Sequence, residues 1–352
     1  MDNFSEVIDL QALTDWMTAQ DLGSGPIENA GLLEGGTQNF LLKFTRDDRD
    51  YVLRRPPQYL RKNSNSTMLR EARVLEALAD STVPHPGFIA VCEDESILGA
   101  CFYLMEPIDG FNAANGLPAY HASDPAIRHR MGLAMVEGIT ALGAVDYKSV
   151  GLEGFGKPEG FLERQVPRWM AQLESYNQLE GWPGLSSLPG MDVIPDWLEL
   201  NRPAEFTPGI MHGDYHLANV MFCHDSAELA AIVDWELCTI GDPLLDLGWL
   251  MAMWHDPEEE ERHDQRAAKL ILADGFPTIE EIVDHYAQRT TRNLEALSWY
   301  GVLACFKLGA ILEGTYARAC AGQAPVETGD ALHAHTLDLF NRALRMIGKT
   351  NG

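Results

Sequence analysis

The chain has 352 residues, 46% of them hydrophobic, and its 26 Lys and Arg residues against 52 Asp and Glu residues give a formal net charge of −26. This charge disfavours nucleic acid and anionic membranes as binding partners, and the sequence contains no run of about 18 apolar residues that could span a membrane. The length allows a large buried core and predicts two lobes of an ordinary globular protein.

An amphipathic helix is expected over residues 6–20, ahead of three strand-like runs at 27–34, 38–44 and 51–54. Turn-type residues separate these runs, which predicts an antiparallel meander. The N-terminal sequence Met-Asp-Asn-Phe-Ser-Glu is acidic and lacks the pattern of a signal peptide, so we expect a cytoplasmic protein.

The turn between the first two strands contains Gly35, Gly36 and, just beyond them, Asn39. Glycines have no Cβ and would let the backbone approach a nucleotide phosphate closely. A Gly-Gly hairpin turn is also common for purely structural reasons. Because a strand with a cation follows, we expect these three residues to contribute to ATP binding.

The third strand carries Arg54 and Arg55, and the helix expected at 66–79 carries Glu71. In kinases, a strand cation pairs with a helix glutamate and contacts the nucleotide phosphates. Side chains alternate along a strand, so only one of the two arginines can point into the cleft. Aligning Tyr-Val-Leu-Arg with the kinase pattern V-A-I-K selects Arg54. The alternative is that both arginines face solvent.

Two more strands are expected at 88–92 and 100–105, and residues 106–110 (Glu-Pro-Ile-Asp-Gly) then interrupt the pattern. We interpret this interruption as a hinge between lobes. An adenine ring bound there would be held by backbone groups, with Glu106 and Ile108 as the candidates.

The predicted organisation is therefore an N-terminal lobe at 1–105, the hinge at 106–110, and a helical C-terminal lobe at 111–352 that contains the catalytic loop and the acceptor site. Apolar periodicity predicts helices in the C-terminal lobe at 125–143, 159–178, 192–200, 243–254, 258–273, 279–292, 294–320 and 328–348.

Two short segments carry the strongest chemical signal: residues 211–222 (Met-His-Gly-Asp-Tyr-His-Leu-Ala-Asn-Val-Met-Phe) and 231–236 (Ala-Ile-Val-Asp-Trp-Glu). The kinase catalytic loop places its base Asp five residues before a metal-binding Asn, and Asp214 and Asn219 have this spacing. Asp234, behind an apolar strand, fits the second metal ligand. Carboxylate and amide oxygens suit Mg²⁺, so the sequence predicts ATP-dependent phosphoryl transfer.

His212 and His216 have the i, i+4 spacing of a metal pair on a helix. Gly213 and the apolar run at 220–222 favour a loop followed by a strand instead. The alternative to a metal site is that backbone groups satisfy both histidines, with His212 supporting the loop.

The chain resembles the aminoglycoside phosphotransferase superfamily. Within it, the resemblance is strongest to the phosphotransferase domains related to those fused to some acyl-CoA dehydrogenases. The resemblance extends from Gly35-Gly36 to about Leu344. The stretches that carry it are Tyr-Val-Leu-Arg-Arg-Pro-Pro at 51–57, Arg-Gln-Val at 164–166 with Trp169, Asp-Trp-Glu-Leu-Cys-Thr-Ile-Gly-Asp-Pro-Leu at 234–244, and Phe-Lys-Leu-Gly-Ala-Ile-Leu-Glu-Gly-Thr-Tyr-Ala-Arg at 306–318.

This resemblance implies an α+β, protein-kinase-like fold of two lobes, with a five-stranded antiparallel sheet and a mainly helical C-terminal lobe. It implies ATP in the cleft, Mg²⁺ on Asn219 and Asp234, and Asp214 as the base. Arg54 stands where relatives carry Lys or Arg. Asp242 matches a position that braces the catalytic loop from a following helix, which we interpret as structural support.

The resemblance also places an acceptor pocket, for a small molecule with a hydroxyl group, in the C-terminal lobe. Its candidates are Arg164, Trp169, Glu236, Glu313 and Arg318, although Trp169 could belong to the core and Glu236 could face the metals or orient its strand. A hydroxyacyl thioester is slightly favoured as acceptor. It would need a basic patch, for which the candidates are Lys157, Arg164, Arg168, Arg202 and Arg318. An aminoglycoside or amino alcohol, which would need carboxylates, and a nucleotide-binding pseudokinase remain the alternatives.

Overall fold

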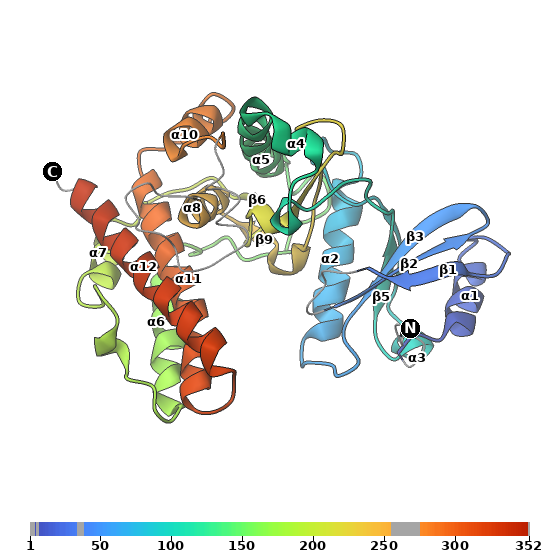
Figure 1. Cartoon of the computed structure of the whole chain (residues 1–352), viewed down its shortest axis with the longest axis horizontal. Helices are drawn as coiled ribbons and strands as arrows, with labels where there is room; N and C mark the ends of the chain where they lie inside the picture. The colour runs from blue at the N-terminus through green and yellow to red at the C-terminus, as the bar shows by residue number, and fades with distance from the viewer. Residues whose placement is uncertain (1–3, 5–6, 34–38, 255–274, 351–352) are drawn as a thin grey trace.

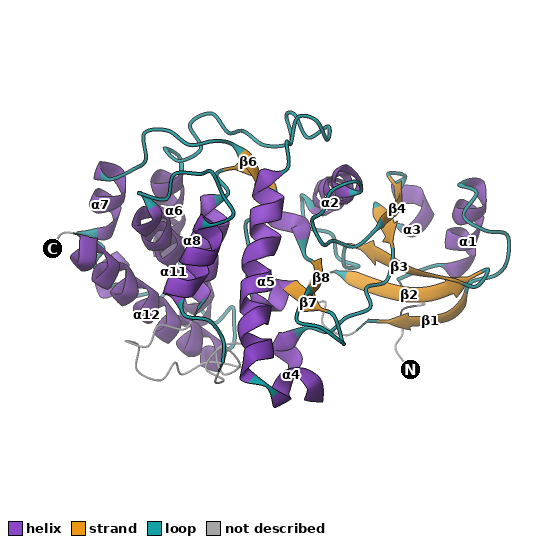
Figure 2. Cartoon of the chain, turned by 90° about the horizontal axis from the view of Figure 1, so that it is seen from above, coloured by secondary structure: helices purple, strands orange, loops and turns teal. Residues whose placement is uncertain are grey.

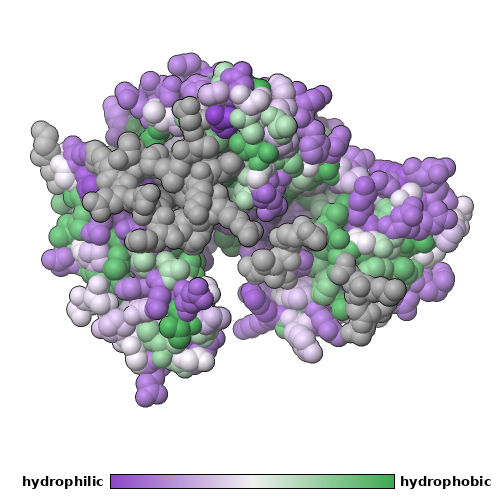
Figure 3. Space-filling model, in the orientation of Figure 1, coloured by the Kyte–Doolittle hydropathy of each residue, from purple (hydrophilic) through white to green (hydrophobic). Residues whose placement is uncertain are grey.

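The computed structural model describes residues 4, 7–33, 39–254 and 275–350. A β-sheet with three helices forms one part of the molecule, and a larger assembly of helices forms the other (Figure 1). Polar side chains cover much of the face seen in Figure 3, which is hollowed between the two parts. The predicted α+β class and five-stranded antiparallel sheet are confirmed.

The sheet has the strand order β1-β2-β3-β5-β4, and every neighbouring pair is antiparallel. The first three strands form the predicted meander, whereas the fourth strand in sequence lies at the edge and the fifth pairs with β3. The strands are β1 Glu28–Leu32, β2 Phe40–Arg46, β3 Arg49–Arg55, β4 Phe88–Cys92 and β5 Phe102–Met105.

Helices cover both faces of this sheet. Helix α2 (Ser64–Leu78) lies between the sheet and the helical part, while α1 (Leu10–Ala19) and α3 (Glu95–Leu98) belong to the core on the other face (Figures 1 and 2). Alternation along β5 divides its side chains between the two cores: Phe102 and Leu104 pack with α1, and Tyr103 packs with the core that includes α2. This alternation determines which strand residues can face the site.

Residues 106–110 follow β5, and the N–H of Phe111 then donates to the carbonyl of Phe222 at 2.9 Å, so the chain enters the helical part against the segment that contains Phe222. Helices α11 and α12 run side by side there, and α11 also packs against α8 and α6. The helices are α4 Ala119–Ser123, α5 Pro125–Ala144, α6 Gln165–Ser175, α7 Ile194–Leu200, α8 Leu244–Met253, α10 Ile279–Ala287, α11 Leu297–Cys320 and α12 Val326–Thr350.

The helix expected at 159–178 begins only at Gln165, because Arg164 donates to the carbonyls of Lys157 and Glu159 and closes a turn instead. The helix expected at 258–273 lies outside the described residues. None of the described helices is both long and apolar enough to cross a membrane.

Two short antiparallel pairs hold the segments singled out in the sequence. Strand β6 (Gly209–Met211) pairs with β9 (Thr239–Gly241), and β7 (Val220–Phe222) pairs with β8 (Leu229–Ile232). The loop with Asp214 therefore begins at β6 and ends at β7, and the segment with Asp234 follows β8.

Candidate active site

The loop after β6 is fixed by a buried carboxylate on α8. Asp246 accepts hydrogen bonds from the backbone N–H groups of His212 and Gly213 at 2.6 and 2.8 Å. Gly213 has φ +87°, and a Cβ there would lie 2.5 Å from the carbonyl oxygen of Leu237, so the position requires glycine. The loop is thus held in one conformation from two sides.

The brace expected of Asp242 is therefore made by Asp246 instead. Asp242 is buried, but it accepts from the N–H of Leu244 and from the hydroxyl of Tyr300, so it supports the start of α8 and the contact with α11. The expectation that Asp242 braces the loop was therefore wrong by four residues, because the carboxylate that points at the loop comes from within α8 and not from the residue before it.

His212 is fully buried and bonded to backbone through both ring nitrogens. Its Nε2 lies 2.9 Å from the carbonyl oxygen of Val233, and its Nδ1 accepts from the N–H of Asp214 at 3.3 Å. Burial lowers the pKa of His212, so the ring is neutral, and the two contacts fit one tautomer. His212 therefore lies where a supporting residue is expected, with no ring nitrogen left for a metal.

Asp214 is held by donors on both carboxylate oxygens. Trp249 on α8 donates its indole N–H to Oδ1 at 3.0 Å, and Asn219 donates its amide to Oδ2 at 3.1 Å and to the backbone carbonyl of Asp214 at 2.9 Å. Burial opposes ionisation, but interactions with His216 outweigh it and lower the pKa of Asp214 to about 2. The carboxylate is therefore ionised at neutral pH and fixed in orientation.

Asn219 and Asp234 are brought together by the β7–β8 pair. The N–H of Val233 donates to the backbone carbonyl of Asn219 at 2.9 Å. Asp234 has φ +65°, an uncommon conformation for a residue with a Cβ, and its side chain is 40% exposed. The amide nitrogen of Asn219 is used on Asp214, so its oxygen remains for a metal ion, which makes Asn219 and Asp234 a fitting oxygen ligand pair for Mg²⁺.

Arg54 connects the sheet to this group. Its Nε lies 2.8 Å from a carboxylate oxygen of Glu71 on α2, and its Nη2 lies 2.9 Å from Oδ1 of Asp234. Tyr103 pairs with Arg54 across β3 and β5 and donates its hydroxyl to the same Glu71 oxygen at 3.1 Å. Residues directly opposite in an antiparallel pair share a face, which explains why both meet α2.

Arg55 lies on the other face, with its guanidinium 3.4 Å from the carbonyl oxygen of Val7. Both arginines are buried, so the alternative that both face solvent is wrong. The register chosen from the sequence, with Arg54 directed toward Glu71, matches the geometry.

The other residues expected near the nucleotide either make no hydrogen bond or ion pair with this group among the described residues or lie outside them. Gly35 and Gly36 lie outside the described residues, and Asn39 is partly buried just before β2. Glu106 is exposed and pairs with Arg49 at 3.1 Å, and its backbone N–H donates to Gly87 at 2.8 Å. Ile108 is partly buried in the segment between the two parts of the molecule.

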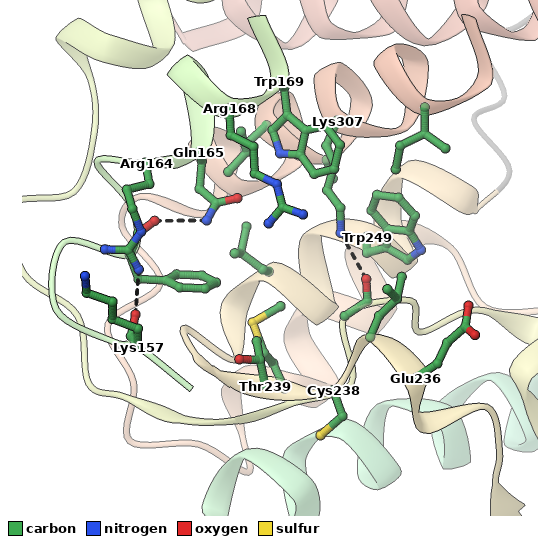
Figure 4. A pocket seen from close by; sticks show the side chains of 18 of the residues that line it. Lys157, Arg164, Gln165, Arg168, Trp169, Glu236, Cys238, Thr239, Trp249 and Lys307 are labelled. Atoms are coloured by element: carbon green, nitrogen blue, oxygen red, sulfur yellow. Dashed lines mark hydrogen bonds between the residues drawn. The ribbon is translucent and has the colours of Figure 1, made fainter. Parts of the chain in front are cut away.

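A cavity of about 650 Å³ lies beside the catalytic loop, with Gly213 in its wall. Arg164, Trp169 and Glu236, three of the candidates for the acceptor pocket, line it. Figure 4 shows Lys307 and Trp249 together on one side, Lys157 and Arg164 on the opposite side, and Arg168 between them. The cavity therefore extends from the loop that carries Asp214 to an exposed, positively charged rim.

Glu313 and Arg318 do not line this cavity, so the structure does not bring them together with the other candidates for the acceptor pocket. Glu313 is fully buried and accepts from the indole N–H of Trp182 at 2.7 Å, and it lies 2.8 Å from Nδ1 of His333. Arg318 donates to the hydroxyl of Thr315 one turn earlier. Along α11, Glu313 points about 120° away from Lys307, whereas Arg318 lies about three turns farther toward the end of the helix.

Three residues at the site were not found from the sequence: Trp249, Lys307 and Asp246. Each lies in an apolar helical run, α8 or α11, far from the motif in sequence. A charged residue inside a run that is otherwise buried was the available signal for Lys307 and Asp246.

The chain is similar to several known proteins. The model of the phosphotransferase enzyme family matches residues 31–282. Acyl-CoA dehydrogenase family member 10 of Mus musculus is 33% identical over 286 residues, which is 80% of this chain but 26% of that protein. The chain thus spans about a quarter of the length of this relative.

Among solved structures, a protein from Ralstonia eutropha that is provisionally classed as an aminoglycoside phosphotransferase is 30% identical, with a TM-score of 0.79 and coverage of 96% of this chain and 98% of its own. An aminoglycoside phosphotransferase in a ternary complex with AMP-PNP and hygromycin B has a TM-score of 0.60 at 15% identity, covering 95% of this chain and 98% of its own. The second likeness concerns the fold alone.

Proposed function

The chain belongs to the phosphotransferase enzyme family, and we propose that it transfers the γ-phosphate of ATP, in an Mg²⁺-dependent reaction, to a hydroxyl group of a small molecule. The observation that carries this proposal is the convergence of Asp214, Asn219 and Asp234 beside a cavity, with Arg54 bonded to Asp234 from the opposite lobe.

Asp214 is the proposed base. The hydroxyl proton would pass to its carboxylate, whose two oxygens are oriented by Trp249 and Asn219. Its low pKa makes it a weak base, which suits phosphoryl transfer, because bond breaking to the leaving group runs ahead of proton loss in a loose transition state. Its main contribution is then to align the attacking oxygen.

Asn219 and Asp234 are the proposed metal ligands. One amide oxygen and one carboxylate cannot saturate Mg²⁺, which takes its remaining ligands from phosphate oxygens and water. Bound there, the ion would neutralise charge that develops on the phosphates. Arg54 adds a permanent positive charge nearby, and Glu71 holds the guanidinium in position.

We favour an acceptor with oxygen-rich or anionic groups, of which a hydroxyacyl thioester is the leading candidate. Among the described residues, the cavity wall contains one carboxylate, Glu236, and five cations, in a chain whose net charge is −26. A polycationic aminoglycoside would be repelled by this lining, whereas the phosphates of coenzyme A would find partners at the rim. The cations are Arg70, Lys157, Arg164, Arg168 and Lys307.

The experiment is a screen of ATP consumption with β-hydroxyacyl-CoA thioesters, aminoglycosides and amino alcohols, followed by mass detection of the phosphorylated product. A phosphorylated thioester supports the favoured acceptor, and a phosphorylated aminoglycoside or amino alcohol supports the alternative. Tight Mg·ATP binding with no phosphorylated product from any acceptor would indicate the pseudokinase.

A further inference from the structure

Lys307 lies beside the proposed base, although the two residues are far apart in the sequence. Its Nζ lies 4.1 Å from the centre of the Trp249 ring, and the N–H of that same ring donates to Oδ1 of Asp214 at 3.0 Å. Nζ also donates to the carbonyl oxygen of Gly213 at 3.0 Å. One indole ring and one backbone carbonyl therefore fix the ammonium next to Asp214.

The ammonium retains capacity for a ligand. An ammonium has three N–H donors, and the bond to Gly213 uses one of them. Within the described residues, no carboxylate oxygen lies within 4.0 Å of Nζ, while the side chain lines the cavity and is only partly buried. A partly dehydrated cation without a bonded carboxylate is costly unless something else solvates it.

Two of the other cations of the cavity, Arg70 and Arg164, hold the protein's own backbone. Arg70 donates to the carbonyls of Phe155 and Cys238 and stacks on the Phe155 ring, so it holds loops together. Arg164 donates to two carbonyls of its own turn. Lys307 is partly buried, whereas the other four cations of the cavity are exposed, and it lies beside Trp249 and against the loop that carries Asp214 (Figure 4).

We infer that Lys307 binds the acceptor directly and selects acceptors that carry a carbonyl or carboxylate oxygen near the reacting hydroxyl, against acceptors that carry an ammonium group there. The inference rests on the proposed function and deepens it. With its hydroxyl on Asp214, such an acceptor would place the neighbouring oxygen on Nζ, so two points on the protein would fix its orientation. Lys307 is thus a specificity residue, because it contacts the substrate without taking part in bond making.

The charge on Lys307 depends on pH within an accessible range. Burial lowers its pKa to about 8, an effect that Arg168 on α6 increases and that Asp214 on the catalytic loop and Asp246 on α8 oppose. The ammonium form is therefore dominant at neutral pH and is lost as the pH rises through about 8. Recognition of an anionic acceptor should weaken over the same interval.

The test uses three small probes of matched shape: β-hydroxybutyrate, its neutral amide, and the amino alcohol in which an aminomethyl group replaces the carboxylate. Binding of each is measured with Mg·AMP-PNP present, by ligand-observed NMR, for the wild type, Lys307→Gln and Lys307→Arg. Arg202, a candidate for the basic patch from the sequence, does not line the cavity and pairs with Glu199 instead, so Arg202→Gln serves as the control.

The affinity of the wild-type protein should be highest for the acid, lower for the amide and lowest for the amino alcohol. Lys307→Gln should lower the affinity for β-hydroxybutyrate by roughly ten- to hundredfold, as expected for the loss of a charge-assisted hydrogen bond. It should also erase the preference for the acid over the amino alcohol. From about pH 7 to about pH 9 the wild type should lose about tenfold in affinity for the acid. Lys307→Arg, which does not titrate there, should show no such loss, and Arg202→Gln should behave as wild type.

An unchanged preference in Lys307→Gln, with unchanged Kd for Mg·AMP-PNP as evidence of folding, would overturn the inference. A raised Kd for Mg·AMP-PNP with unchanged probe binding would also overturn it, because the lysine would then serve the nucleotide. If the probes bind in a Lys307-dependent way but no hydroxyl compound is ever phosphorylated, the inference stands and the proposed reaction fails.

Discussion

Replacing Arg54 by alanine should weaken Mg·ATP binding, whereas the same change at Arg55 should not. The two arginines are neighbours on β3, both are buried, and they point to opposite faces of the sheet. Arg54 contacts Glu71 and Asp234, and Arg55 contacts the backbone of Val7. The pair therefore offers a matched comparison of one residue type in one strand.

The size of the effect follows from the contacts. A hydrogen bond from a cation to a phosphate contributes on the order of 1.5–3 kcal/mol, so the Kd for Mg·AMP-PNP should rise roughly ten- to hundredfold in Arg54→Ala. The mutation also leaves Glu71, which is 1% exposed, without its cation. Breaking a buried ion pair costs about 3–5 kcal/mol, so Arg54→Ala should unfold at a lower temperature. Adding Glu71→Gln should recover part of that stability and none of the nucleotide affinity.

Calorimetry with Mg·AMP-PNP measures the affinity, and thermal unfolding measures the stability, without any knowledge of the acceptor. Arg55→Ala should change the Kd by no more than a few-fold, even if lost packing lowers its Tm. Arg54→Lys should retain part of the affinity, because the charge remains while bidentate geometry is lost. A larger loss of affinity in Arg55→Ala than in Arg54→Ala would refute the assignment of Arg54 to the nucleotide-facing side of β3. No loss of affinity in either variant would show that neither arginine contributes to binding the phosphates.

Three further changes test the rest of the site. Asp214→Asn should lower kcat on the order of 10²–10⁴-fold, with Mg·AMP-PNP affinity nearly unchanged by calorimetry; wild-type kcat would exclude Asp214 as base. Asp234→Ala should abolish Mg²⁺-dependent nucleotide binding, because the ion loses its carboxylate ligand beside Asn219; unchanged affinity in a folded protein would contradict this. Asp246→Ala should leave two buried N–H groups of the catalytic loop without an acceptor, at about 1–3 kcal/mol each, visible in the midpoint of urea unfolding; an unchanged midpoint would show that the brace is dispensable.

Local sequence patterns predicted those parts of the site that depend on local geometry. The five-residue spacing of Asp214 and Asn219 lies within one loop, whose conformation Gly213 restricts. The two-residue alternation of β3 indicated that only one of the two arginines faces the cleft, and the alignment with the kinase pattern selected Arg54. Both steps could succeed because the sheet is regular there and its register is unbroken.

The rest of the site depends on how helices far apart in the sequence pack together. Asp242 lies just before α8 and Asp246 lies within its first turn. Only the packing of α8 against the loop that carries Asp214 shows that Asp246 faces this loop. Glu313 and Lys307 lie on one helix, α11, yet they face different surroundings, a buried tryptophan and histidine for one and the cavity for the other. A helix buried on nearly all sides has no polar face to indicate direction, so the sequence alone could not separate these roles.

The central claim is that Asp214 directs transfer of the γ-phosphate of ATP to a hydroxyl group. The most direct measurement follows ADP and product together, by phosphorus NMR, with Mg·ATP and a β-hydroxyacyl-CoA thioester. We expect one phosphate ester for each ADP formed, with phosphorus coupled to the carbinol proton, and loss of both signals in Asp214→Asn. ADP accompanied only by free phosphate, or ester formation that survives Asp214→Asn, would contradict the claim.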